Sequence, residues 1–231
     1  MANFQDLISF VTGYGATYNP SKNVLKLPQL NSLYTASQTS LAEVVSNNTA
    51  YNNKVNERVI AFKDLKSLST RLINSLQTTD ATKEIIADAK AFNKKMQGIR
   101  TKAIETPSDP NVPAPNTIST SQQSYDQQIQ HLAGIISVLQ SEPSYTPNET
   151  ELQITTLTTK QVDLTAKNSA VATAYTNVSN SRIARDTTIY GTDTGLFDVA
   201  TEIKKYVKSV FGATSPQFSQ VKGIEFTKKK K

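Results

Sequence analysis

The chain has 231 residues, with 25 Lys and Arg side chains against 19 Asp and Glu, which gives a formal net charge of +6. It contains no Cys and one His, so disulfide scaffolds, thiolate metal sites and metal centres built on several imidazoles are excluded. The apolar stretch from Leu7 to Val11 is too short for a signal peptide, and no run approaches the roughly 20 apolar residues that span a bilayer. We therefore expect no transmembrane segment and a cytoplasmic location.

A heptad pattern begins at Leu30, where seam residues recur in alternating steps of four and three. Pro28 suits a first helical turn because its missing N–H would be unpaired there in any case. The pattern predicts one long helix from about Pro28 to Gln77. The seam runs through Tyr34, Ser37, Leu41, Val44, Asn48, Tyr51 and Val55, and continues with Val59, Phe62, Leu65, Leu72 and Leu76.

A second seam of the same phase predicts another long helix, from about Thr155 to Tyr190. Its positions are Leu157, Gln161, Leu164, Asn168, Val171, Tyr175, Val178, Arg182 and Ile189.

Similar segments lead into the two long helices, at an offset of 127 positions. Tyr18 and Pro20 in the first segment match Tyr145 and Pro147 in the second, and the apolar residues that follow keep the same spacing. Two amphipathic helices of similar composition also match by chance somewhere along a chain. The shared entry segment favours an internal duplication.

These patterns predict an all-α protein, an elongated helical bundle of coiled-coil character with two related three-helix units and long central helices. The first repeat covers residues 1–105 and the second repeat covers residues 119–226, with a Pro-rich linker or crossover at 106–118 and a basic tail at 227–231. The expected helices are 4–12, 28–77 and 80–103 in the first repeat, and 121–140, 155–190 and 196–211 in the second. Residues 218–226 are expected to be extended.

No group of residues with the spacing of a catalytic site stands out. His131 lies beside Leu132 on an apolar helix and is expected to be a boundary or surface histidine, and the sequence holds no phosphate loop or serine elbow. We expect no catalytic residue, no cofactor and no metal site, and therefore a non-enzymatic protein.

Five polar residues interrupt the two seams. A polar group inside an apolar stripe costs stability but can fix the register and partner number of a helical assembly. The alternative is that these side chains lie at the margin of the seam and bond to water. The five candidate register or interface residues are Asn48, Arg58, Gln161, Asn168 and Arg182.

The basic character of the chain leaves a nucleic-acid interface open as an alternative function. Outside the terminal lysines, basic residues concentrate on one expected helix, where the lack of stacking aromatic residues favours a solvated helix face as the explanation. A membrane-active helical protein is the other alternative, although the apolar run from Leu132 to Leu139 is short for it. The candidate anion contacts are Lys90, Lys94, Lys95, Arg100 and Lys102.

The segment from Tyr206 to Phe226, together with residues 145–149 and Arg185-Asp186, resembles an uncharacterised helical protein family of Bacteroidota-type bacteria. The resemblance covers about a third of the chain. It implies a bacterial origin and a helical fold, and it brings no activity or site residue.

Long helix faces without a chemical site predict a structural or protein-interaction protein. We expect it to act through self-assembly or partner binding along those faces, so that its partner is a second copy or another protein.

Overall fold

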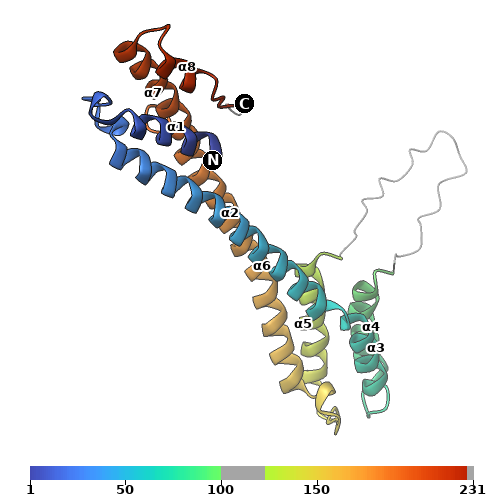
Figure 1. The fold of residues 1–231 in the computed structure, drawn as a ribbon. Coiled ribbons are helices and arrows are strands. Elements are labelled where there is room, and N and C mark those ends of the chain that lie inside the picture. The colour runs from blue at the N-terminus through green and yellow to red at the C-terminus, as the bar shows by residue number, and fades with distance from the viewer. Residues whose placement is uncertain (100–122, 228–231) are drawn as a thin grey trace, which may run out of the picture. The chain divides into compact units, whose positions relative to one another are not determined.

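A computed structural model describes residues 1–99 and 123–227, and within these ranges the protein is all-α, without strands (Figure 1). The helices are α1 (Ala2–Gly13), α2 (Leu27–Phe62), α3 (Leu65–Leu76), α4 (Lys83–Gln97), α5 (Tyr125–Ser141), α6 (Ile154–Tyr190), α7 (Leu196–Phe211) and α8 (Pro216–Lys222). Short 3₁₀ turns η1 (Gly15–Thr17), η2 (Asn23–Leu25) and η3 (Thr150–Leu152) lie in the connections.

The chain forms two compact units, and each of them contains one part of α2 and one part of α6. Unit one comprises Met1–Asn52 and Ala174–Lys231, whereas unit two comprises Asn53–Thr173. The boundaries of these two units do not coincide with those of the expected repeats 1–105 and 119–226. Because α2 and α6 each continue from one unit into the other, both of the expected repeats would contribute residues to both units.

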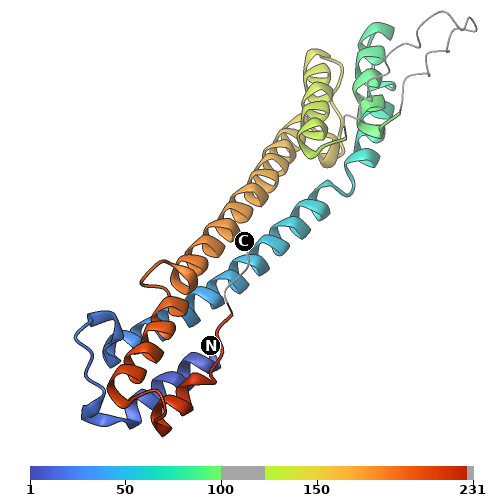
Figure 2. The ribbon, with the colours of Figure 1, turned by 90° about the horizontal axis from the view of Figure 1, so that it is seen from above.

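Unit one has a core in which α1, η2 and the start of α2 pack against α7 and α8 (Figure 1). Phe4, Leu7, Leu30 and Val199 are fully buried there. The two ends of the described chain meet on this core, where Asn3 Nδ2 donates to the carbonyl of Glu225 at 2.8 Å. Figure 2 shows α1 beside the C-terminal segment.

Unit two has a core formed by α3, α4, α5 and the start of α6. The helices α4 and α5 approach closely, since a Cβ atom added to Gly134 would lie 2.3 Å from the ring of Phe92. Where α4 ends and α5 begins, Gln123 Nε2 donates to the carbonyl of Lys95 at 2.6 Å. The two helices are therefore antiparallel neighbours whose adjoining ends lie close together (Figure 1).

Residues 18–27 and 145–154 have the same local structure. Each begins with a buried Tyr and contains one 3₁₀ turn, and each ends where a long helix starts, α2 at Leu27 and α6 at Ile154. The correspondence extends to α3 and α7, whose buried positions are also offset by 127. Those positions are Ser69, Leu72, Ile73 and Leu76 in α3, and Leu196, Val199, Ala200 and Ile203 in α7.

The single helix expected over 28–77 is wrong, because the structure has a break at residues 63–64. α2 ends at Phe62, Asp64 adopts φ −97° and ψ 7°, and α3 begins at Leu65. Phe62 and Leu65 are both buried in the core of unit two, whereas Val59 and Ile60 are exposed.

Two other boundaries differ from the expected ones. α4 begins at Lys83 and not at 80, because the hydroxyl of Thr82 accepts a hydrogen bond from the Ile85 N–H. Residues 216–222 are helical and not extended, since Ser215 caps the helix and Pro216 occupies its first turn. The whole of the expected linker 106–118 and the lysines 228–231 lie outside the described residues.

Candidate functional site

The structure pairs two of the five expected register residues. Arg58 on α2 and Asn168 on α6 lie in unit two, and Arg58 Nη1 donates to Asn168 Oδ1 at 3.0 Å. Asn168 Nδ2 in turn donates to Asp126 Oδ1 at 2.7 Å. Since Asp126 is in the first turn of α5, the hydrogen bonds join three helices.

The guanidinium of Arg58 also stacks on an aromatic ring. Its Cζ lies 4.0 Å from the ring centroid of Tyr125, which makes an edge contact with Phe62 at 4.7 Å. Arg58 Nε is buried without a hydrogen-bond partner. Burying a donor without a partner costs free energy. The stacking on Tyr125 and the hydrogen bond to Asn168 are the contacts that hold Arg58 in this position.

A carboxylate lies next to this pair and accepts from two lysines. Glu57 is 2.8 Å from Lys54 Nζ and 3.1 Å from Lys167 Nζ, and these two hydrogen bonds lower the pKa of Glu57, that from Lys54 most strongly. The hydrogen bond that Lys167 donates to Glu57 raises the pKa of Lys167. All three side chains are partly exposed, so their contribution to stability is small.

The other three register candidates do not join this cluster. Asn48 and Arg182 are exposed, and Gln161 is half-buried. The expectation of a polar seam contact thus applies to Arg58 and Asn168 alone among the five.

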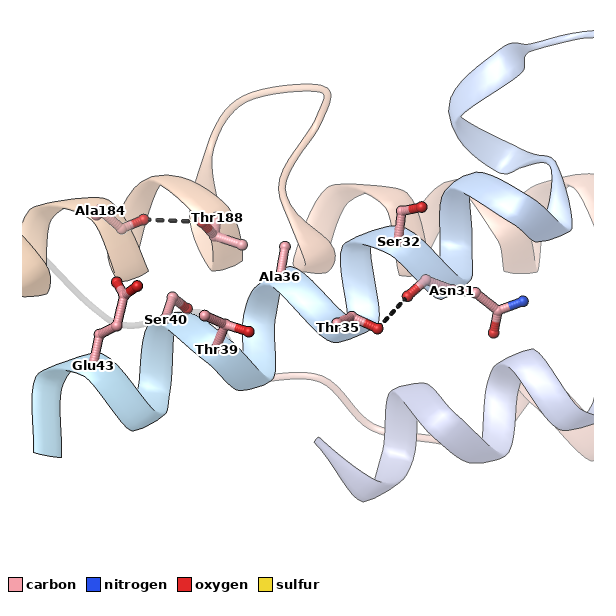
Figure 3. Close-up of a pocket in the computed structure, with 9 residues that line it drawn as sticks. All are labelled: Asn31, Ser32, Thr35, Ala36, Thr39, Ser40, Glu43, Ala184 and Thr188. Atoms are coloured by element: carbon pink, nitrogen blue, oxygen red, sulfur yellow. Dashed lines mark hydrogen bonds between the residues drawn. The ribbon is translucent and has the colours of Figure 1, made fainter. Parts of the chain in front are cut away.

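A groove lies in unit one, between the first part of α2 and the last part of α6, with a volume of about 680 Å³ (Figure 3). Small side chains line most of it, and Glu43 reaches toward Ala184. The lining residues are Asn31, Ser32, Thr35, Ala36, Thr39, Ser40 and Glu43 from α2, and Ala184 and Thr188 from α6. Nothing in the sequence periodicity singles out this face, because its residues lie beside the apolar seam.

Most hydroxyl groups in the groove are satisfied within their own helix. Ser32 donates to Pro28 O at 3.0 Å, Thr35 to Asn31 O at 3.1 Å, Ser40 to Ser37 O at 2.9 Å and Thr188 to Ala184 O at 3.0 Å. These side chains therefore present methyl and methylene groups to the groove rather than free donors. Such a surface suits the close approach of another helix better than that of a polar ligand.

The candidate anion contacts on α4 are exposed as far as they are described. Lys90, Lys94 and Lys95 face solvent, and Lys95 Nζ lies 5.9 Å from the ring centroid of Phe92. Lys94 and Lys95 are in the last turn of α4, where basic residues favour the helix dipole. Arg100 and Lys102 lie outside the described residues.

The histidine is placed differently from its expected position. His131 is only 4% exposed, in the core of unit two, so the expectation of a boundary or surface residue is wrong. Across the described ranges, no three His, Cys, Asp or Glu side chains are grouped so that they could hold a metal ion.

No helix in residues 1–99 or 123–227 has both the length and the apolar character needed to cross a bilayer. No family model, curated protein or solved structure matches the chain.

Proposed function

We propose that this is a non-enzymatic structural or protein-interaction protein that acts through self-assembly along the faces of its long helices. The observation that carries the proposal is the groove of unit one between α2 and α6 (Figure 3). Its small side chains and internally bonded hydroxyls allow a helix or a large apolar side chain to approach the backbone closely.

A second copy of the chain offers side chains that suit this groove. Val45 on α2 is 68% exposed and Ile183 on α6 is 62% exposed, and neither lines the groove. When an exposed apolar side chain of one copy enters the groove of another copy, the two copies form a head-to-tail contact. Such a contact repeats from copy to copy, as a structural protein requires.

Light scattering coupled to size exclusion tests the proposal, with the full chain at increasing concentration. We expect the mass to rise above 25.3 kDa, the mass of one chain. Ala36→Trp fills the groove and Val45→Ser removes a large apolar side chain, so each should raise the concentration needed for association by about tenfold or more. Asn56→Trp places the same ring at an exposed position of α2 in unit two and serves as the control.

A mass that stays at one chain across the concentration range would contradict self-assembly through this face. Equal effects of Ala36→Trp and Asn56→Trp would show that association takes place elsewhere.

We also propose that the two repeats arose by internal duplication. The identical offset of the two entry segments, of the two 3₁₀ turns and of the buried positions in α3 and α7 supports this proposal.

A further inference from the structure

A polar pocket with a volume of about 340 Å³ lies in unit two, between the end of α3 and the segment that begins at Tyr145. This volume is within the range of about 300–1,000 Å³ that is typical of small-molecule sites. Hydroxyl groups and two carboxylates line most of this unit-two pocket. Its polar lining includes Ser75, Thr78, Thr79 and Asp80 on one side, and Thr146 and Glu149 on the other.

The unit-two pocket offers hydrogen-bond acceptors and negative charge. Among the described residues, neither Asp80 nor Glu149 forms an ion pair with a Lys or Arg side chain. Burial raises the pKa of Tyr145, and the charge of the nearby Glu149 raises it further. The hydroxyls of Thr78 and Thr79 donate to backbone carbonyls three residues before them, at 2.7 and 2.8 Å, so their oxygens remain as acceptors. Such a lining suits a ligand that donates hydrogen bonds and carries positive charge.

The corresponding part of unit one is filled by side chains of the chain itself. Lys22 stands where unit two has Glu149, at the offset of 127, and its Nζ lies 2.6 Å from the carboxylate of Glu202 on α7. One helical turn further along α7, the ring of Tyr206 packs edge-on against that of Tyr18, with the centroids 5.3 Å apart. An ammonium group and a phenol ring therefore cover the entry segment of unit one.

Unit two has neither of these two groups. At the same offset, Ser75 stands in the place of Glu202, and Thr79 stands in the place of Tyr206. α3 ends at Leu76, before Thr79, whereas α7 continues past Tyr206. The smaller side chain leaves space in unit two, and the missing ammonium leaves the carboxylates of the pocket without a counter-charge.

We propose that the unit-two pocket binds a small organic amine, whose ammonium lies at Asp80 and Glu149 and whose carbon skeleton fills the space beside Thr79. An ammonium has three N–H donors and no acceptor, which matches a lining of carboxylate and hydroxyl oxygens. The amine supplies unit two with the groups that Lys22 and Tyr206 supply to unit one.

Tyramine is the probe for the first test, because it joins an ammonium to a phenol ring through a short chain. In an NMR titration of the full chain, we expect a dissociation constant on the order of 1 mM, which is reasonable for a ligand of this size. The shifted amide signals should belong to residues 75–80 and 144–149. para-Ethylphenol has the same ring without the ammonium and should bind about tenfold more weakly or less. No binding of tyramine, equal binding of the two compounds, or tighter binding of calcium or magnesium chloride alone would overturn the proposal.

The second test removes the charges of the pocket one at a time. Glu149→Gln and Asp80→Asn keep the size of each side chain, and both positions are exposed, so the fold should be unaffected. Each change should weaken tyramine binding by about fivefold or more. Asp88→Asn, at an exposed position of α4 outside the pocket, is the matched control and should leave binding unchanged. Wild-type affinity in Glu149→Gln would refute the proposed position of the ammonium.

The third test fills the space that the carbon skeleton occupies. Thr79→Tyr gives unit two the residue that unit one has at the matching position, and its ring should reduce tyramine binding by about tenfold or more. Asn74→Tyr places the same ring at an exposed position of α3 outside the pocket, where binding should not change. Undiminished binding in Thr79→Tyr would show that tyramine binds elsewhere.

Discussion

Tyr18 and Tyr145 make the same hydrogen bond at positions 127 residues apart. The hydroxyl of Tyr18 donates to the carbonyl of Leu25 at 2.8 Å, and that of Tyr145 donates to the carbonyl of Leu152 at 3.0 Å. In both cases a buried tyrosine bonds the last residue of a 3₁₀ turn, shortly before a long helix begins. Each tyrosine thereby fixes the entry of one long helix.

Tyr18→Phe and Tyr145→Phe should destabilise the protein to a similar degree. Each change leaves the carbonyl of Leu25 or Leu152 without its tyrosine donor in a buried setting, at a cost of about 1–3 kcal/mol. Chemical denaturation of the two variants and the wild type measures the free energy of unfolding. A large loss for one variant with no loss for the other would show that the two entry segments are not equivalent.

Alkaline pH should weaken the fold through the same two residues. Burial raises the pKa of both Tyr18 and Tyr145 above the ordinary value of 10.0. Because the folded state holds these protons more tightly than the unfolded state, their stabilisation is complete below pH 10 and is lost as the pH rises through the folded pKa values. Denaturation midpoints between pH 9 and 11 should fall less steeply in the double Tyr→Phe variant than in the wild type. Equal slopes would contradict this role.

An acidic side chain in either seam should be costly, and more so on α6. Val171 is 6% exposed, whereas Val44, its counterpart at the offset of 127, is half-buried. Val171→Asp buries a charge without a partner and should cost several kcal/mol, on the order that unfolds a marginal domain. Val44→Asp should cost less, because water reaches the carboxylate.

The exposed positions Thr39 and Ala166 provide a control pair at the same offset. Thr39→Asp and Ala166→Asp should leave the melting temperature nearly unchanged. If Val171→Asp were as silent as these controls, the second seam would not be a buried stripe.

Arg58 and Asn168 should be energetically coupled. Since the two side chains share a hydrogen bond, Arg58→Ala and Asn168→Ala each remove it, and the double variant loses it only once. We expect a coupling free energy of about 0.5–3 kcal/mol in a double-mutant cycle followed by denaturant unfolding. Arg182→Ala, at an exposed seam position, should show no coupling to Asn168→Ala. Additive losses for Arg58 and Asn168 would mean that their contact adds nothing.

Sequence periodicity predicted the helical class and the limits of the best-patterned helices. The helix expected at 155–190 corresponds to α6 at Ile154–Tyr190, and the one at 196–211 corresponds to α7. Heptad spacing also marked Arg58 and Asn168 as polar seam positions. Which seam residues meet could not be predicted, because that depends on how α2 and α6 pair within each unit.

The spacing of apolar residues along the sequence did not predict the features that depend on tertiary contacts. The seam spacing continues through residues 63–64, yet α2 ends at Phe62 and α3 begins at Leu65, so the spacing alone did not reveal the break. His131 is buried although its polar residue type predicts a boundary or surface position. The groove of unit one arises from small residues on two helices, which no single-helix pattern reveals.

The hydrogen bond between Asn3 and Glu225 brings the N-terminal and C-terminal segments of the described chain close together. It holds the two ends of the described chain together in unit one, as the bond from Gln123 to Lys95 holds α5 and α4 together in unit two. A short peptide could therefore join residue 227 to residue 1, and the chain could begin at residue 123 instead. Such a circular permutant, with residues 123–227 translated first, should reach the same fold with nearly the same melting temperature.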